Sequence, residues 1–433
     1  MTYQEAIDKL FTSLPMYQRQ GKAAYKSNLD NTHLLDSHFG HPHLNYPTIH
    51  VAGTNGKGSV SHMIASVLQA SGLKTGLYTS PHLLDFRERI RINGQSIPED
   101  EVSAFVSGNQ EIIRDVQPSF FEMTVALAFD YFAREQVDVA VIETGMGGRL
   151  DSTNIIMPVL SVITNISLDH TEFLGTHPRS IAREKGGIIK EKVPLVIGRA
   201  EEPTEEVLRS LALERDAPVV CADQIYETHF RTLNLDGSMQ LRFSKKGSSS
   251  IESISCDLSG EYQQENIITA FTALEQLQKL NWKISESHIQ EGFASVIAST
   301  GIMGRWHTIG HNPRSICDTA HNVDGIAAVI SQIKQIPWLR LHMVWGLVDD
   351  KDLDMILPLL PQEAIYYFTR SSVPRSMDSK VLAKRAGEFG LKGFPFPNVE
   401  EAYRAAQKEA GADDMIFTGG STFVVADLLV MKF

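Results

Sequence analysis

Short apolar runs separated by amphipathic stretches fill the first two hundred residues. Five of these runs are predicted strands: TIHVAG (48–53), KTGLYTS (74–80), VDVAVIETG (137–145), VLSVITNIS (159–167) and VPLVIG (193–198). After the first run, apolar residues recur at helical spacing from Val60 to Leu68, and Gly72 stands where a helix C-terminal glycine belongs. This alternation predicts a parallel α/β sheet. Polar residues gather at the C-terminal ends of the second, third and fourth runs, the edge where open α/β sheets bind ligands.

The pattern changes between residues 224 and 258 and again near residue 300. HFRTLNLDGSMQLRFS (229–244) alternates around Asp236-Gly237, which predicts a hairpin, and a helix is expected from Tyr262 to Leu280. Strands and helices then alternate again beyond a stretch of small residues. We therefore expect an α/β protein: a P-loop-type, mostly parallel sheet with a small β-rich insertion (1–297), a linker (298–304), and a smaller Rossmann-like α/β domain (305–433).

Composition narrows the class of protein. Forty Lys and Arg stand against 52 Asp and Glu among 433 residues, so the net charge is −12. We therefore expect neither nucleic acid nor an anionic membrane as the main partner. No apolar run approaches the roughly 18 residues of a membrane helix, and the N-terminus lacks the pattern of a secretory signal. Three widely spaced cysteines, Cys221, Cys256 and Cys317, suggest a reducing, cytoplasmic location.

A glycine-rich stretch follows the first predicted strand. IHVAGTNGKGS (49–59) departs from the pattern G-x-x-x-x-G-K-[ST], because Val51 stands at its first glycine and Gly58 separates Lys57 from Ser59. Between a strand and a helix, glycine N–H groups and the helix N-terminus are suited to hold a polyphosphate. Lys57 would neutralise phosphates and Ser59 would coordinate Mg²⁺. A tight turn with a solvated lysine is the alternative.

Three more residues in this domain carry chemistry, each with an ordinary alternative. Glu143 ends an otherwise apolar strand, where a lone carboxylate is commonly a helix N-cap or a surface group. The following GMGGR, with its backbone N–H groups and Arg149, favours a metal-bound carboxylate instead. His170 follows another strand, a position where histidine is commonly structural. Lys185 is expected on a short helix in REKGGI (183–188), where a lysine is normally exposed.

These segments are similar to the motifs of one enzyme family. In order, the chain contains GTNGKGS (53–59), TSPHL (79–83), FFE (120–122), ETGMGGRLDSTN (143–154), LDHTEFLG (168–175), REKGGI (183–188), GRW (304–306), DTAHN (318–322), GLVDDKD (346–352) and GGS (419–421). This set resembles the folylpolyglutamate synthase and dihydrofolate synthase family, relatives of the Mur ligases. SPHL and GGRLD, together with the loop, are typical of the folate branch. The unusual loop then reads as a family variant that binds ATP.

The resemblance implies an ATP and metal site in the first domain. ATP would be bound by Thr54, Asn55, Gly56, Lys57, Gly58, Ser59 and Asn266, the last of these in YQQEN (262–266), where the family commonly has histidine at Tyr262. Two Mg²⁺ ions are implied, with ligands from Ser59, Ser80, Glu143, His170 and Lys185, and a monovalent cation is a further candidate. Lys185 would act as a carbamate, since a desolvated amine with a lowered pKa reacts with carbon dioxide.

The resemblance also implies contacts to the other substrates. Arg305 and Asp318 would reach the same ATP from the second domain, with an interdomain salt bridge as their alternative role. His321 and Ser421 would bind the incoming L-glutamate, although Val323 replaces the usual proline after AHN. The pterin or folate acceptor would contact Phe120, Phe121, Glu122, Leu150, Asp151 and Ser152. We expect the two phenylalanines on a strand, with only one of them facing the core.

The N-terminal segment contains four histidines, His33, His38, His41 and His43. Their spacing runs through a glycine and a proline, so no single helix face collects them, and we interpret them as solvated or capping residues and not as a metal site. NLDNT (28–32) replaces the G-L-x-R type stretch of many bacterial family members. We therefore expect the pterin contacts of this segment to differ.

The implied reaction is ATP-driven ligation of L-glutamate to dihydropteroate, to folyl-(poly)glutamate, or to both. An acyl phosphate would form first, and Lys57, Lys185, Arg305 and His321 are the candidate catalytic residues. Closure at the linker would gate turnover, and we expect a monomer. Two alternatives stay open: a Mur-type UDP-muramoyl ligase, against which SPHL and the lack of a UDP-binding domain before Thr48 argue, and a nucleotide-binding module without ligase activity.

Overall fold

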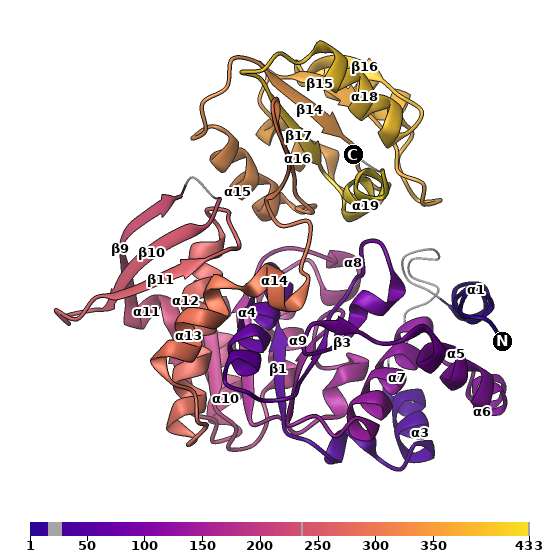
Figure 1. Cartoon of the computed structure of the whole chain (residues 1–433), viewed down its shortest axis with the longest axis vertical. Coiled ribbons are helices and arrows are strands. Elements are labelled where there is room, and N and C mark those ends of the chain that lie inside the picture. The colour runs from indigo at the N-terminus through magenta and orange to yellow at the C-terminus, as the bar shows by residue number, and fades with distance from the viewer. Residues whose placement is uncertain (16–27, 235–236, 432–433) are drawn as a thin grey trace. The chain divides into compact units, whose positions relative to one another are not determined.

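The computed structural model describes residues 1–15, 28–234 and 237–431, and these form two compact units (Figure 1). Unit 1 comprises the described residues of Met1–Asp257 and Gln263–Ile302. Unit 2 comprises Leu258–Tyr262 and the described residues from Met303 onward. The predicted linker, 298–304, stays a prediction, and its first residues lie in helix α14 (Val296–Thr300).

A mostly parallel sheet forms the centre of unit 1. Its eight strands within the described residues are β1 (Thr48–Ala52), β2 (Thr75–Tyr78), β3 (Ile90–Ile92), β4 (Gln95–Ser96), β5 (Val139–Glu143), β6 (Leu160–Asn165), β7 (Leu195–Arg199) and β8 (Val219–Cys221). Their order is β4-β3-β2-β5-β1-β6-β7-β8. β3 and β4 are antiparallel additions, whereas the neighbouring pairs from β2 to β8 are parallel. The carboxyl ends of β2, β5, β1 and β6 therefore meet at one edge, as the sequence predicts.

Helices surround this sheet. They are α1 (Tyr3–Ser13), α3 (Asp30–His38), α4 (Lys57–Ala70), α5 (Glu99–Gly108), α6 (Gln110–Val116), α7 (Phe120–Arg134), α8 (Thr171–Leu174), α9 (Pro178–Lys185), α10 (Thr204–Leu213), α11 (Ala222–Ile225), α12 (Gln263–Lys279), α13 (Glu286–Ala294) and α14. Short 3-10 turns are η2 (Pro42–Leu44), η3 (Phe86–Arg89), η4 (Ser152–Ile155) and η5 (Gly186–Ile188). α4 packs against α12, α13 and α14, and α7 packs against α3.

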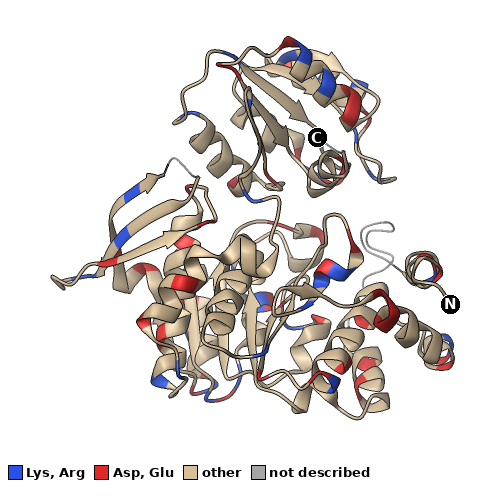
Figure 2. Ribbon diagram, viewed as in Figure 1, with Lys and Arg blue, Asp and Glu red and all other residues tan. Residues whose placement is uncertain are grey.

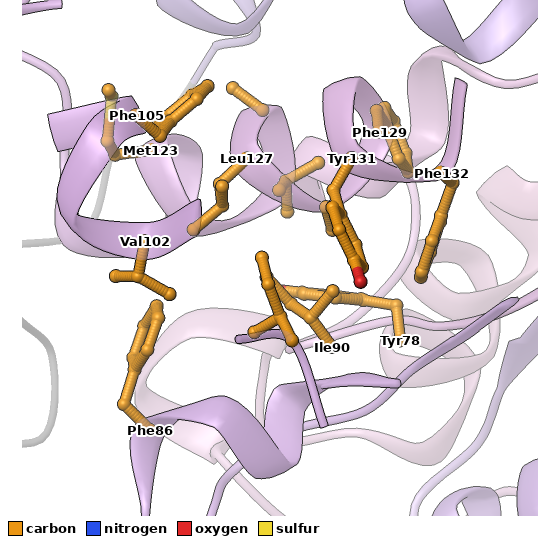
Figure 3. Packing of buried hydrophobic residues seen from close by; sticks show 14 of the residues in the cluster. Tyr78, Phe86, Ile90, Val102, Phe105, Met123, Leu127, Phe129, Tyr131 and Phe132 are labelled. Atoms are coloured by element: carbon orange, nitrogen blue, oxygen red, sulfur yellow. The ribbon is translucent and has the colours of Figure 1, made fainter. Parts of the chain in front are cut away.

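One aromatic-rich core cluster lies between α7, α5 and the β2–β5 side of the sheet. Figure 3 shows Tyr78, Phe86 and Ile90 facing the α7 side chains Leu127 and Tyr131. From β5, the alternate residues Ala140 and Ile142 point into this cluster. Burial of this apolar surface holds the first turn of α7 next to the carboxyl edge of the sheet.

We expected Phe120 and Phe121 on a strand, and this prediction is wrong. Ser119 begins helix α7 with a capping box, in which its side chain accepts from the Glu122 N–H while the Glu122 carboxylate accepts from the Ser119 N–H. A serine followed three residues later by glutamate is a start signal for a helix. The short FFE stretch does not show this signal, because its capping serine lies before it.

The small β-rich insertion is confirmed. β9 (Tyr226–Leu233), β10 (Met239–Lys245) and β11 (Glu252–Cys256) form an antiparallel three-stranded sheet in unit 1. β9 and β10 pair as the predicted hairpin requires, whereas Asp236 of its predicted turn lies outside the described residues.

Unit 2 is a smaller α/β domain with a six-stranded sheet among its described residues. Its strands are β12 (His307–His311), β13 (Arg314–Cys317), β14 (Leu341–Trp345), β15 (Ile365–Phe368), β16 (Lys392–Pro395) and β17 (Met415–Gly419), in the order β12-β13-β17-β14-β15-β16. Only β12 runs antiparallel to its neighbour. The helical segments are α15 (Val323–Ile333), α16 (Leu353–Ile356), η6 (Leu357–Leu359), α17 (Ser379–Glu388), α18 (Val399–Glu409) and α19 (Thr422–Val430).

Charged residues are spread over both units. Figure 2 shows Lys and Arg interspersed with Asp and Glu along the elements of each unit. In the described part of the chain, no helix is both long and apolar enough to cross a membrane.

Candidate active site

The phosphate-loop candidate lies between β1 and α4, and its backbone requires glycine. Gly56 is the N-cap of α4 with φ +85°. A Cβ atom at Gly56 would lie 2.1 Å from the Asn266 side-chain oxygen on α12, which is too close for any side chain. The structure thus places Asn266 directly against the loop.

The end of β6 fixes the loop from its other side. The Thr164 hydroxyl donates to the Asn55 carbonyl at 2.6 Å, and the Asn55 N–H donates to the Asn165 side chain at 2.9 Å. Thr54 is tied to Ser167, whose N–H donates to the Thr54 hydroxyl at 3.0 Å. Sequence reasoning did not find these anchors, because they depend on β6 lying next to β1.

Two lysines donate to the same loop carbonyl. Lys57 Nζ lies 3.0 Å from the Gly53 carbonyl oxygen and 3.1 Å from that of Thr54, while Lys185 Nζ lies 2.6 Å from the Gly53 oxygen. Lys185 is only 3% exposed. Burial, and secondarily the nearby Lys57 ammonium, holds the pKa of Lys185 well below its usual range. The expected alternative of a solvated lysine does not apply to Lys185.

Helix α12 contacts the first turn of α4 through two amides. Gln263 Nε2 donates to the buried Ser59 hydroxyl at 3.2 Å, and Asn266 Nδ2 donates to Gln263 Oε1 at 2.8 Å. The Ser59 hydroxyl, predicted as a Mg²⁺ ligand, therefore lies at the start of α4 beside the two amides. The sequence does not indicate the role of Gln263, because its partner Ser59 is distant in sequence.

Glu143 and Ser80 come together at the sheet edge, as predicted. Glu143 ends β5 opposite Val51 of β1, and its carboxylate is buried. The Ser80 N–H, just beyond β2, donates to Glu143 Oε2 at 3.1 Å. A buried carboxylate next to a phosphate-binding loop is suited to hold a divalent cation.

His170 follows β6 and precedes α8, with φ +48°. Its Nε2 atom lies 3.9 Å from Asp169 Oδ2, and the side chain is partly exposed. The described residues contain no cluster of three or more His, Cys, Asp or Glu that would enclose a metal ion. Magnesium commonly binds through one or two carboxylates together with waters and substrate phosphates. The oxygen donors Glu143, Ser59 and Ser80 fit that mode of binding.

The two glycine motifs GMGGR and REKGGI pack directly on each other. A Cβ atom at Gly148 would lie 2.7 Å from the Lys185 carbonyl oxygen, and the Arg149 N–H donates to the Glu184 carbonyl at 2.7 Å. We expected Arg149 near Glu143, but its guanidinium pairs with Glu184 at 2.8 Å and is largely exposed. Close backbone packing between these motifs positions Lys185.

Of the acceptor-pocket candidates on α7, Phe121 contacts the loop that follows β5. The Phe121 ring lies against Gly145, where a Cβ atom would approach it to 2.4 Å, and is 6.1 Å from the Tyr78 ring between centroids. Phe120 is buried. Glu122 is also buried and accepts from Asn31 Nδ2 at 3.4 Å, which brings the NLDNT segment to α7. Glu122 thus has a local structural role in capping α7.

Asp151 closes the loop that follows Gly145. One carboxylate oxygen accepts from the Met146 N–H at 2.8 Å, and the other accepts from the Thr153 hydroxyl at 2.5 Å and its N–H at 3.0 Å. Burial raises the pKa of Asp151, against the opposing effect of these hydrogen bonds. Leu150 is partly exposed and Ser152 is buried.

Arg89 is a buried cation that sequence reasoning missed. Its Nε donates to His82 Nδ1 at 2.7 Å, and its guanidinium lies 5.2 Å from the Phe120 ring centroid. Burial lowers the pKa of Arg89. The arginine stands in FRERIRI (86–92), where it resembles an ordinary alternating polar position, so its burial is not visible in the sequence.

In unit 2, the remaining candidates gather at the carboxyl ends of adjacent strands. Asp318 follows β13 and accepts from the Tyr262 hydroxyl (2.5 Å), the Trp306 N–H (2.7 Å) and the Ala320 N–H (2.8 Å). Burial raises the pKa of Asp318. Ser421 is the buried N-cap of α19, directly after β17, the parallel neighbour of β13.

Arg305 and His321 share a partner in the same part of unit 2. Arg305 donates to the Thr319 hydroxyl, and His321 Nδ1 lies 3.0 Å from the Thr319 carbonyl oxygen. A carbonyl accepts only, so Nδ1 of His321 carries a proton.

Two of the four N-terminal histidines bind one carboxylate. His41 Nδ1 and His43 Nδ1 lie 2.7 and 2.6 Å from the two oxygens of the buried Asp36. His38 is the last residue of α3, with its ring edge-on to Phe39. His33 is an exposed residue of α3.

Comparison with known proteins agrees with this architecture. The Mur ligase middle domain model matches residues 51–274, and the Mur ligase glutamate ligase domain model matches residues 304–422. The "Dihydrofolate synthase/folylpolyglutamate synthase" of Escherichia coli K12 is 32% identical over 88% of this chain and 85% of its own length. The structure "E.coli FolC in complex with DHPP and ADP" has a TM-score of 0.86 at 29% identity, covering 99% of this chain and 97% of that one.

A longer relative matches as well. The "Probable bifunctional folylpolyglutamate synthase/dihydropteroate synthase" of Haloferax volcanii is 32% identical over 99% of this chain, which spans half the length of that protein. Fold, loop and matched domains together define a Mur-type, ATP-dependent ligase with two α/β domains. Within that class, the chain belongs to the folylpolyglutamate synthase/dihydrofolate synthase family.

Proposed function

We propose that this chain is an ATP-dependent ligase that joins L-glutamate to the carboxylate of dihydropteroate, of (tetrahydro)folyl-(poly)glutamate, or of both. The observation that carries the proposal is that the buried Lys185 and Lys57 both donate to one carbonyl of the glycine-rich loop. Glu143 lies at the carboxyl edge of the same sheet. Relatives named for these two activities match most of the chain, and one solved neighbour holds ADP and DHPP. The Mur-type UDP-muramoyl ligase and the module without ligase activity are not favoured.

The proposed reaction has two steps, phosphorylation of the acceptor carboxylate and attack by the glutamate amine. A carboxylate oxygen of the acceptor bonds to the γ-phosphorus of ATP, and the bond from that phosphorus to the β–γ bridging oxygen breaks, which gives an acyl phosphate and ADP. The glutamate amine then bonds to the acyl carbon, and the carbon–oxygen bond to phosphate breaks. Phosphate leaves, and the amine releases a proton. Transfers of this kind depend on positioning and on neutralisation of charge.

The loop residues supply that neutralisation in unit 1. The backbone N–H groups of Thr54 and Asn55 donate to Asn165. Those from Gly56 to Ser59, at the N-terminus of α4, would face a bound polyphosphate, and Lys57 would exchange its loop carbonyls for phosphate oxygens. Glu143, Ser59, Ser80 and His170 would hold Mg²⁺, which when bound offsets the charge of the phosphates. Asn266 would contact the nucleotide, and a monovalent cation stays a further candidate.

Lys185 is proposed to react with carbon dioxide. Its buried, uncharged amine would form a nitrogen–carbon bond to CO₂ and lose a proton, which gives a carbamate that can bind a second Mg²⁺. The supporting observation is the desolvated site beside Lys57, which disfavours an ammonium at Lys185.

Unit 2 is proposed to complete the substrate contacts. Arg305 and Asp318 would bind ATP, and His321 and Ser421 would bind glutamate. Phe120, Phe121, Glu122, Leu150, Asp151 and Ser152 would contact the acceptor in unit 1. A cytoplasmic monomer without a nucleic-acid or membrane partner remains our expectation.

The experiment is phosphate release with ATP, Mg²⁺ and glutamate, with dihydropteroate and tetrahydrofolate as separate acceptors. Release that requires glutamate is expected with at least one of them. Turnover on both would show a bifunctional enzyme, and turnover on one would assign a single step. Release that is independent of glutamate, or that requires a UDP-linked peptide acceptor, would overturn the proposal.

A further inference from the structure

A chain of three buried polar side chains links the middle of β1 with the loop 145–152. His50 Nε2 lies 2.9 Å from the Thr153 hydroxyl, and that hydroxyl lies 2.5 Å from Asp151 Oδ1. His50 and Thr153 have no exposed surface, and Asp151 is 5% exposed. Neither His50 nor Thr153 has a role in the reaction described above, although both are polar groups in a dry interior.

Donor and acceptor can be assigned in the two hydrogen bonds that join His50, Thr153 and Asp151. Burial raises the pKa of Asp151, but the Met146 N–H and the Thr153 N–H both donate to its carboxylate and favour the ionised form, whose oxygens only accept. To the ionised carboxylate, the Thr153 hydroxyl donates. That hydroxyl therefore accepts from His50, so Nε2 of the ring carries the proton. Burial lowers the pKa of His50 to about 3, so the ring is neutral and has this one N–H.

The other ring nitrogen of His50 supports this assignment. His50 Nδ1 is buried and has no hydrogen-bond partner among the described residues. An unpaired buried nitrogen destabilises the fold, so the histidine is a poor choice for packing alone. An apolar residue would fill a strand position between Ile49 and Val51 at lower cost. The N–H donated to Thr153 is what the histidine adds.

The loop depends on the orientation of Asp151. Asp151 Oδ2 accepts from the Met146 N–H at 2.8 Å, which closes the loop next to Gly145, where the Phe121 ring packs. A rotated Asp151 would release Met146 and loosen the surface against Phe121. His50 stands three residues before Gly53 on the strand that leads into the phosphate loop.

We propose that His50 is a positioning residue, which acts through Thr153 to hold Asp151 and thereby the acceptor-binding loop 145–152 in register with the phosphate loop. This inference rests on the proposed function, because it takes that loop as the binding surface for the pteroyl group. His50 contacts no substrate itself. Its removal is expected to weaken acceptor binding while nucleotide binding persists.

The test compares variants that remove or keep each hydrogen bond. Thr153→Val and His50→Leu remove a donor, whereas Thr153→Ser and His50→Gln keep one at the same place. With the accepted pteroyl substrate, we expect KM for the acceptor to rise about tenfold in the first pair, the size of the net contribution of one buried hydrogen bond. We expect KM for ATP and the ADP dissociation constant to stay within about twofold, and the second pair to recover most of the loss.

A matched control is available in unit 2. His342 is also fully buried, near the start of β14, where its Nδ1 lies 3.0 Å from the Tyr367 hydroxyl and its Nε2 lies 3.3 Å from Asp414 Oδ2. His342→Leu therefore removes buried hydrogen bonds at the strand end opposite to the carboxyl ends that carry the unit 2 candidates. A rise in acceptor KM equal to that of His50→Leu in this control would overturn the inference. Equal changes in all parameters, or no recovery in Thr153→Ser and His50→Gln, would also overturn it.

The inference and the proposed function fail in different ways. Wild-type protein that releases no glutamate-dependent phosphate with any pteroyl acceptor contradicts the function, and the inference falls with it. Active wild-type protein whose Thr153→Val and His50→Leu variants keep the wild-type acceptor KM contradicts the inference alone. Circular dichroism and ADP titration identify any variant that does not fold. If the variants at His50 or at Thr153 do not fold, the comparison of the two variants at the other position tests the inference.

Discussion

At the scale of single residues, Lys185 is the clearest case in which burial determines chemistry. The sequence places it on a short helix, α9, where most lysines are solvated. Contact between the Gly148 and Gly187 backbones and the neighbouring segments instead draws α9 against the loop, and Lys185 Nζ reaches the Gly53 carbonyl. Burial, and secondarily the nearby Lys57 ammonium, lowers the pKa of Lys185 and so favours its neutral, nucleophilic amine.

Replacement of Lys185 tests this account. We expect Lys185→Ala and Lys185→Arg to lower kcat for glutamate ligation on the order of a hundredfold, as for removal of one electrostatic stabiliser. Arginine keeps a cation but cannot form the carbamate. Short-chain carboxylates added to Lys185→Ala are expected to restore part of the activity, measured as glutamate-dependent phosphate release. Full activity of Lys185→Arg would rule out the carbamate.

The sequence indicates candidate residue types more readily than the partners of those residues. Glu143 and Ser80 meet as expected, because parallel strands bring their carboxyl ends together. Arg149 pairs with Glu184 and not with Glu143, since the tight packing of two glycine motifs directs it away. Arg89 and the contact between His50 and Thr153 could not be found, because burial and long-range partners leave no periodic signal.

At the scale of elements, the phosphate loop illustrates how glycine serves a close approach. Gly56 and Gly72 begin and follow the same helix, α4, and both have left-handed backbone, with φ +85° and +87°. A Cβ atom at Gly56 would clash with Asn266, whereas one at Gly72 would meet nothing within 4 Å. A side chain at either position strains the backbone, but only one at Gly56 also disturbs the loop. Comparing the two substitutions therefore distinguishes the effect of strain from the effect of a changed loop.

We expect Gly56→Ala to weaken ADP binding by at least about tenfold, since the loop N–H groups would move away from the phosphates. Gly72→Ala should lose about 1 kcal/mol of stability, the usual effect of a side chain at positive φ, and bind ADP normally. Isothermal titration of ADP and thermal unfolding of both variants measure these effects. Equal ADP binding in the two variants would contradict the assignment of the loop.

Asp257, which directly follows β11, is an ionisable residue that binds the backbone of α14. Asp257 accepts from the Ile297 N–H at 2.8 Å, and its other oxygen has no partner among the described residues. Burial raises the pKa of Asp257 to about 6, although the backbone N–H groups of α14 oppose the rise. The folded state then binds a proton that the unfolded chain has lost at the same pH.

Because this pKa is raised on folding, the stabilisation is present below about pH 4 and is lost as the pH rises through about 6. The contribution is about 1–2 kcal/mol after allowance for partial exposure. Chemical unfolding between pH 4 and 7 should show this fall in the free energy of unfolding, and Asp257→Asn should flatten it. An unchanged slope in Asp257→Asn would contradict the raised pKa.

Secondary structure was predictable wherever the pattern was long and periodic. The strands β1, β2, β5, β6 and β7, the hairpin strands and helix α12 follow the expected segments. The prediction failed at FFE, because the serine that begins α7, Ser119, precedes this stretch. Short edge strands such as β4 and β16 have little apolar pattern, because one of their sides has no neighbouring strand.

At the scale of the whole molecule, each unit has its own sheet, its own core and its own group of candidate residues. Lys57, Lys185 and Glu143 belong to unit 1, whereas Arg305, Asp318, His321 and Ser421 belong to unit 2. The hydrophobic pattern predicted two α/β domains and the β-rich insertion within the first of them. The matched Mur ligase domains correspond to the two units.

The central claim is that glutamate ligation passes through an acyl phosphate. The most direct measurement uses a pteroyl acceptor with ¹⁸O in the reacting carboxylate, together with ATP, Mg²⁺ and L-glutamate, and determines the isotope in the phosphate released. Because the carboxylate oxygen bonds to the γ-phosphorus and stays with it when the amine attacks, we predict one ¹⁸O atom in each phosphate per amide formed. Amide formation with unlabelled phosphate would contradict the account.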